Sequence, residues 1–140
     1  GEAYSCLPQQ PLLVDILAGE ESQVLFLQTS KVLHLCPQSC PFHQALLSNL
    51  LSGMAQKNLK LNHKIRHTTP KTIRARLLSY LSQQATEQGS HRFTIPFDRQ
   101  QLADYLCVDR SALSHELGKM QKEGLLAFSR SQFQLFSPQD

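Results

Sequence analysis

Four side chains at the start of one predicted helix could form hydrogen bonds with a nucleic acid. Arg110, Ser111, Ser114 and His115 follow Asp109, whose carboxylate is suited to cap a helix. An arginine there can donate two hydrogen bonds to the O6 and N7 atoms of a guanine, and hydroxyl or imidazole groups can bond to bases or phosphates. Arg110 is therefore the strongest candidate for reading a base, and Ser111, Ser114 and His115 are candidates for shorter contacts.

Two predicted helices, joined by a short turn, position these residues. Asp98 followed by Gln101 is a capping-box pattern that begins a helix at Arg99, and the helix after Asp109 runs toward Gly124. The inward-facing residues are expected to be Leu102, Ala103 and Leu106 in the first helix and Leu113, Leu117 and Met120 in the second. This pattern predicts a helix-turn-helix, in which the second helix enters the major groove of DNA.

The turn and the segments on either side complete the unit. Cys107 occupies a turn position where glycine would relax the backbone more easily, so we expect slight strain there. Alternating apolar residues predict a short strand over 93–97, and a second alternation predicts a hairpin over 125–136 with Arg130 at its tip. A basic hairpin tip is typical of the wing of a winged helix, which contacts phosphates.

The charge of the chain is unevenly distributed. Residues 57–140 carry thirteen Lys and Arg against seven Asp and Glu, whereas residues 1–56 carry one Lys against four acids. This distribution indicates a polyanionic partner for the second part, although a solvated basic face would give the same count. Arg99, Lys119 and Arg130 are the candidates for phosphate contacts that we add to the four residues above.

The segment before this unit has a heptad pattern. A helix is predicted from Phe42 to about His67, with Pro41 in its first turn and a length of about 39 Å. Its seam consists of Leu47, Leu51, Met54, Asn58, Leu61 and Ile65. Such a seam favours a dimer helix in which Asn58 fixes the register, and the alternative is a helix packed on its own domain. Thr69-Pro70 then predicts the cap and first turn of another helix, which Gly89 ends.

The first forty residues predict strands and turns. Leu12–Leu17 and Val24–Leu27 are short apolar runs separated by a turn over Gly19–Ser22. So few strands cannot bury both faces of a sheet, and the chain starts at Gly1 without a Met. We therefore expect that an N-terminal portion is missing from this chain.

The stretch FDRQQLADYLCVDRSALSHELGKMQKEGLL, residues 97–126, resembles the helix-turn-helix of the family of the cyclic-AMP receptor protein and the fumarate-nitrate regulator. The resemblance extends over nearly the whole chain, with residues 22–40 similar to a last sheet strand and a short helix. It implies an α+β, mostly helical fold with three parts: a remnant of an effector-binding β-roll over 1–40, a dimerisation helix over 41–68 and a winged helix-turn-helix domain over 69–140. It also places the base-reading positions on Arg110, Ser111, Ser114 and His115.

The resemblance further implies a transcription regulator that binds an inverted repeat in double-stranded DNA as a homodimer and contacts RNA polymerase. A small effector or a redox signal would act through the sensor part. Leu12 and Leu13 stand where cyclic-nucleotide binders have an Arg-Ser pair, and Lys57 and Asn58 stand where they have adenine-contacting hydroxyls. Because leucines cannot neutralise a phosphate, we expect no binding of cyclic AMP. The cysteines of the iron-sulfur sensors lie in a part that this chain lacks, so no cofactor is expected.

Other functions have weaker support. Cys36 and Cys40, with His34 and His43 nearby, could bind a metal. Ligand spacing this loose is more often accidental, and the prolines between these residues argue against a helix that would align them, so no metal is expected. We expect no enzymatic activity, because no phosphate loop, nucleophile elbow or carboxylate pair is present. The chain has no apolar run long enough for a membrane span, so a soluble cytoplasmic protein is expected. The alternative function is a winged-helix module that binds a protein instead of DNA.

Overall fold

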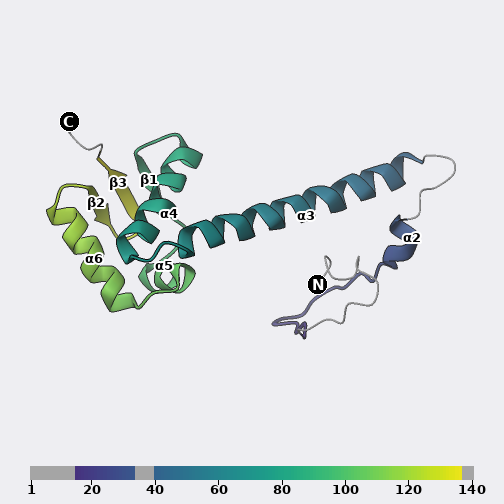
Figure 1. Ribbon diagram of the computed structural model, residues 1–140. Coiled ribbons are helices and arrows are strands. Elements are labelled where there is room, and N and C mark those ends of the chain that lie inside the picture. The colour runs from purple at the N-terminus through teal and green to yellow at the C-terminus, as the bar shows by residue number, and fades with distance from the viewer. Residues whose placement is uncertain (1–14, 34–39, 137–140) are drawn as a thin grey trace. The chain divides into compact units, whose positions relative to one another are not determined.

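The computed structural model describes residues 15–33 and 40–136 of the chain, which divides into two units, residues 1–59 and 60–140. The elements of the second unit are α4 (Ile73–Gln88), β1 (Arg92–Thr94), α5 (Arg99–Leu106), α6 (Arg110–Lys122), β2 (Leu126–Ser129) and β3 (Gln132–Leu135) (Figure 1). The strands form an antiparallel sheet in the order β1-β3-β2. The predicted α+β class with a winged helix-turn-helix is therefore confirmed.

The core of this unit joins the three helices to the sheet. Its buried members are Leu77, Tyr80, Leu81, Phe93, Ile95, Leu102, Ala103, Leu106, Leu113, Leu117, Met120, Leu126 and Phe133. The inward-facing residues that the sequence predicted for α5 and α6 are all among them. Burying a leucine or phenylalanine side chain stabilises a fold by about 1.5–3 kcal/mol, so this core holds α6 firmly on α4 and α5.

Helix α4 begins later than the sequence indicated. Its N-cap is Thr72, whose side chain accepts a hydrogen bond from the N–H of Ala75, so the prediction that Thr69-Pro70 caps the helix is wrong. The Thr69 hydroxyl instead donates to the Ile65 carbonyl at 2.6 Å and closes the preceding helix. Gly89 ends α4 in the left-handed conformation at φ 61°, as predicted.

Helix α3 spans Pro41–Thr68, which confirms the long helix predicted between Pro41 and His67. Several apolar side chains of its heptad seam are exposed, with Leu51 at 63%, Leu61 at 62% and Ile65 at 60%. Their role as a dimer interface stays a prediction.

The part before α3 contains one described helix, α2 (Thr29–Leu33), which agrees with the short helix expected within residues 22–40. Residues 22–28 form no strand, so the strand predicted over Val24–Leu27 is wrong. Phe26 is 92% exposed and Leu25 is 80% exposed, because no neighbouring strand among the described residues pairs with this segment. The turn after Ala18 is present as a bend, in which the Ser22 hydroxyl donates to the Glu20 carbonyl.

Candidate nucleic-acid interface

The caps of α5 and α6 are formed as the sequence predicted. Asp98 accepts a hydrogen bond from the Gln101 N–H at 2.8 Å, and the Gln101 side chain accepts one from the Asp98 N–H at 2.9 Å. Asp109 caps α6 through the N–H of Ala112 at 2.9 Å. The reciprocal pair at α5 and the single bond at α6 satisfy backbone groups that a helix start leaves unpaired, and they fix where each helix begins.

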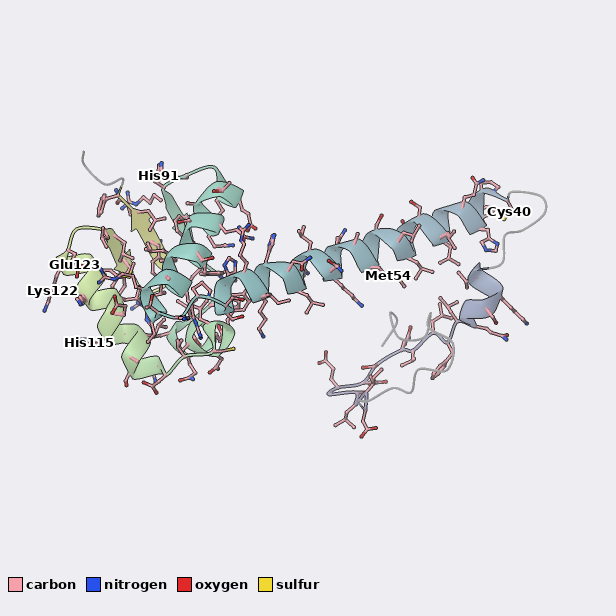
Figure 2. All side chains as sticks on the ribbon, viewed as in Figure 1. Cys40, Met54, His91, His115, Lys122 and Glu123 are labelled. Atoms are coloured by element: carbon pink, nitrogen blue, oxygen red, sulfur yellow. The ribbon has the colours of Figure 1, made fainter. Side chains whose placement is uncertain are left out.

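Helix α6 has one buried face and one exposed face. Leu113, Leu117 and Met120 are fully buried, whereas the candidate contact residues on the helix, Arg110, Ser111, Ser114, His115 and Lys119, are all exposed. Figure 2 labels His115 near the middle of α6 and Lys122 with Glu123 at its C-terminal end. The structure thus places five of the seven predicted residues on the solvent-exposed part of one helix.

Ser111 forms a hydrogen bond within the protein that the sequence did not indicate. Its hydroxyl donates to the Asp109 carboxylate at 2.5 Å. This bond and the one from the Ala112 N–H hold the pKa of Asp109 below its ordinary value of 3.8. The Ser111 hydroxyl therefore uses its proton to stabilise the cap. Toward any other partner it can act only as a hydrogen-bond acceptor.

The turn between α5 and α6 is strained as expected. Cys107 ends α5 in the left-handed region at φ 54°, which favours glycine. Arg76 of α4 holds this turn: its Nη1 donates to the carbonyls of Leu106 at 2.9 Å and Cys107 at 3.1 Å, and its Nε donates to Pro70 at 2.7 Å. Sequence reasoning missed Arg76, since its partners in the turn lie about thirty residues away and no local pattern marks them.

A second arginine that sequence reasoning missed ties α6 to α4. Arg74 donates from Nε to Glu116 at 2.6 Å, and from its two terminal nitrogens to both carboxylate oxygens of Glu123 at 2.7 and 3.0 Å. These bonds raise the pKa of Arg74 and lower that of Glu123. Two-point arginine–carboxylate pairing is geometrically specific, so it helps to set the orientation of α6.

Of the other two predicted residues, Arg130 belongs to the wing, the β2–β3 hairpin, and Arg99 is the first residue of α5. Arg130 is exposed at the tip with φ 52°. Arg99 lies 4.9 Å from the Phe128 ring centroid and donates to the Arg130 carbonyl at 3.4 Å. Burial lowers the pKa of Arg99. Its guanidinium is thus bound to the wing, which favours a role in positioning the tip.

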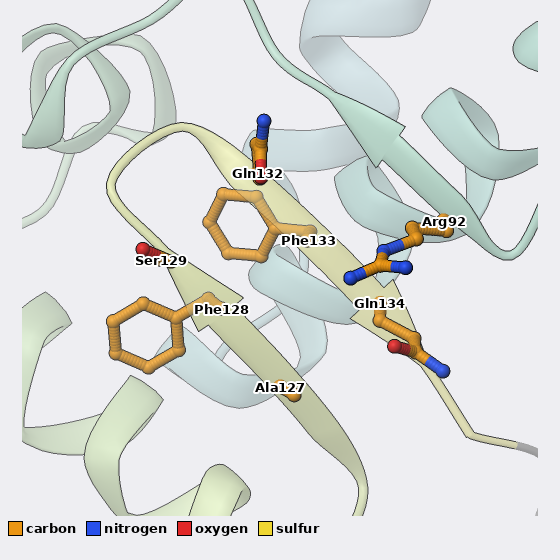
Figure 3. A pocket seen from close by; sticks show the side chains of 7 residues that line it. All are labelled: Arg92, Ala127, Phe128, Ser129, Gln132, Phe133 and Gln134. Atoms are coloured by element: carbon orange, nitrogen blue, oxygen red, sulfur yellow. The ribbon is translucent and has the colours of Figure 1, made fainter.

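The wing also carries a shallow pocket (Figure 3). Arg92, Gln134 and the rings of Phe128 and Phe133 are among its lining residues, and its volume is about 160 Å³. Small-molecule sites usually measure about 300–1,000 Å³, so this pocket is a feature of the wing surface and too small for a ligand site. The Phe128 and Phe133 rings stack across the hairpin at 5.9 Å and stiffen it.

Helix, turn, capped second helix and wing define a winged helix-turn-helix, a class of nucleic-acid-binding domain. The family model of the Crp-like helix-turn-helix domain matches residues 75–139. This part of the chain is therefore a Crp/Fnr-type helix-turn-helix, a domain of DNA-binding transcription regulation. No curated protein is similar enough to the chain to count as a match.

Two further observations concern other kinds of site. Among residues 15–33 and 40–136, no group of three or more His, Cys, Asp or Glu side chains could hold a metal ion. The cysteine and histidine pairs considered above fall partly outside these residues, as do Leu12 and Leu13. None of the described helices combines the length and the apolar character that crossing a membrane requires.

Proposed function

We propose that the chain is a sequence-specific transcription regulator of the Crp/Fnr type, which binds an inverted repeat in double-stranded DNA as a homodimer. The observation that carries the proposal is the exposed face of α6, whose N-terminal turns present Arg110, Ser114 and His115 beside a fully buried core face. A helix held in this way can enter the major groove without losing its packing.

Within this proposal the residues have different roles. Arg110 reads a guanine, and Ser114 and His115 bond to bases or phosphates. Lys119 and the wing-tip Arg130 contact phosphates, since both are exposed cations on the same domain. Ser111 acts indirectly, because its hydroxyl proton is bonded to the Asp109 cap. Arg99 positions the wing tip through one of its five N–H groups, and the others can still contact a phosphate.

Dimer formation is proposed through the α3 seam of Leu47, Leu51, Met54, Asn58, Leu61 and Ile65. The exposed leucines support this, since apolar side chains repeated over 28 residues of one helix gain stability by packing against a second copy. Two copies related by a twofold axis would place their α6 helices in major grooves about one helical turn apart.

Control of binding is assigned to a sensor part that does not respond to cyclic AMP, and residues 1–40 are proposed as its remnant. RNA polymerase is the proposed partner of the DNA-bound dimer. Both proposals rest on the resemblance given above, together with Leu12 and Leu13 at the phosphate-binding positions.

The test is selection from a random duplex library, followed by titration of the selected and scrambled duplexes at several salt concentrations. Enrichment of an inverted repeat, with a slope of log affinity against log salt of about −5 to −9, would support dimeric recognition. Failure to enrich any sequence would favour the alternative, a winged-helix module that binds a protein.

A further inference from the structure

A groove separate from the proposed DNA-binding face lies between the last turns of α3 and helices α4 and α5. Its volume is about 490 Å³, which is in the usual range of small-molecule sites. The lining residues that matter here are Lys60, His63, Lys64, Tyr80, Phe97 and Tyr105. All of them belong to the second unit of the chain.

Aromatic rings provide the apolar part of the groove. The centroids of Phe97 and Tyr105 are 5.1 Å apart, those of Tyr80 and Tyr105 are 5.3 Å apart, and those of Tyr80 and Phe97 are 5.9 Å apart. His67 packs edge-on against Tyr80 at 5.6 Å and is itself held by Ser79 at 2.9 Å. Such a cluster is rigid and favours a ligand with a flat ring, which can stack or meet the ring edges.

The positive charges of two lysines at the rim of the groove favour an anionic ligand. Lys60 and Lys64 are one turn apart on α3, and the Lys64 ammonium lies 5.9 Å from the Tyr105 ring centroid. The acidic residue of the groove, Glu87, already accepts hydrogen bonds from Gln83 at 2.6 Å and Gln84 at 2.8 Å. The groove therefore has two lysines and one carboxylate, and that carboxylate is already hydrogen-bonded to two glutamines. A negative group of a ligand is favoured near the lysines.

The groove adjoins the heptad seam and shares one residue with it, Leu61. At 3.6 residues per turn, His63 falls on the side of α3 opposite Ile65, whereas Lys64 lies about 100° from Ile65. A ligand in the groove would touch the end of α3, helix α4 and helix α5 at the same time.

We propose that this groove binds a small planar aromatic carboxylate, with its ring against the partly exposed Phe97 and Tyr105, at the edge of the nearly buried Tyr80, and its carboxylate between Lys60 and Lys64. This proposal does not depend on DNA binding by α6. It adds a ligand site on the domain that carries the helix-turn-helix, at the point where α3 meets that domain.

The experiment is an NMR titration of the ¹⁵N-labelled chain with 2-naphthoate, repeated with the uncharged 2-naphthamide. We expect saturable shifts centred on Lys64, Tyr80 and Tyr105, and binding of the amide that is weaker by about tenfold. The double variant Lys60→Glu/Lys64→Glu should lose naphthoate binding by about tenfold or more. Lys60→Gln/Lys64→Gln should lie between this variant and the unmodified chain.

The matched control is Lys71→Glu/Lys122→Glu, which changes the net charge equally but lies outside the groove. It should bind naphthoate as the unmodified chain does, and amide spectra show whether each variant is folded. The proposal is overturned if a folded Lys60→Glu/Lys64→Glu binds naphthoate undiminished, if the amide binds equally well, or if the shifts centre on Leu47–Asn58 instead.

Discussion

The helix-turn-helix and the long helix α3 differ in what covers their leucines. Leu113 and Leu117 of α6 are fully buried, whereas Leu51 and Leu61 of α3 are more than 60% exposed. Helix α6 has α4, α5 and β2 as neighbours within the same unit, and each contributes to one core. The comparison teaches that α6 is positioned by its own chain, whereas apolar side chains of the α3 seam remain exposed within it.

The largest expected effect is dissociation of the proposed dimer. Leu51→Asp/Ile65→Asp places charges on the seam, and each buried apolar side chain contributes about 1.5–3 kcal/mol, so dissociation should rise at least about a thousandfold. Sedimentation velocity should show a dimer for the unmodified chain and a monomer for the variant. Ser52→Asp, next to the seam, should remain a dimer, and a dimeric double variant would exclude the seam as the interface.

The next effect concerns the core that positions α6. Leu117→Ala should lower the free energy of unfolding by about 2–5 kcal/mol, because it leaves a cavity beneath the proposed recognition helix. Leu59→Ala makes the same change at a side chain that is 55% exposed and should have little effect. Urea denaturation followed by circular dichroism measures both, and equal losses would contradict the comparison.

A smaller effect separates base contacts from phosphate contacts. Arg110→Ala should weaken binding to the selected duplex by about 1–3 kcal/mol and relax the preference at one base pair. Lys119→Ala should weaken binding to all duplexes and reduce the salt slope by about one. Fluorescence anisotropy with duplexes substituted at each position distinguishes them. If Arg110→Ala weakened every sequence equally, Arg110 would be a phosphate contact.

The stability of the fold should depend on pH through His67, a side chain in the last turn of α3 that is 1% exposed. Burial, followed by the charges of Arg66 and His63, lowers the pKa of His67 below its ordinary 6.5. Because the unfolded chain binds this proton more tightly, the stabilisation is complete above pH 6.5 and is lost as the pH falls below that value. Thermal melts should show a shallower loss between pH 7.5 and about 5.5 for His67→Gln. His91→Gln, at an exposed position, should keep the original dependence.

The smallest effect is expected at the Arg74 bridge, which is open to solvent. Hydrogen bonds from Arg74 lower the pKa of Glu123 below its ordinary 4.5, so the bridge stabilises the fold above that pH and is lost as the carboxylate becomes protonated. Arg74→Met should therefore destabilise the chain slightly at pH 7, and the difference should shrink toward pH 3. Melting temperatures at both pH values test this, and a constant difference would mean that Arg74 acts through packing.

Local patterns predicted much of the second unit. The caps are short-range signals, because each depends on one residue and on a partner three or four positions along the chain. They are Asp98 with Gln101, Asp109, and Gly89. The inward faces of α5 and α6 followed from helical spacing for the same reason. The cap of α4 was placed too early because two threonines, Thr69 and Thr72, offer similar local chemistry. They differ in their bonds, since Thr69 donates back to Ile65 and Thr72 accepts from Ala75.

The sequence by itself therefore determined helices α5 and α6 with their N-caps, the strained turn at Cys107 and the exposed face with Arg110, because each depends on neighbours within about one turn. The tertiary structure alone decided that Arg76 holds the turn, that Arg74 joins Glu116 to Glu123, and that Arg99 lies against the wing. It also decided that Tyr80, Phe97 and Tyr105 meet Lys64 in one groove. These contacts join residues far apart along the chain, and only the packing of helices and sheet brings such residues together.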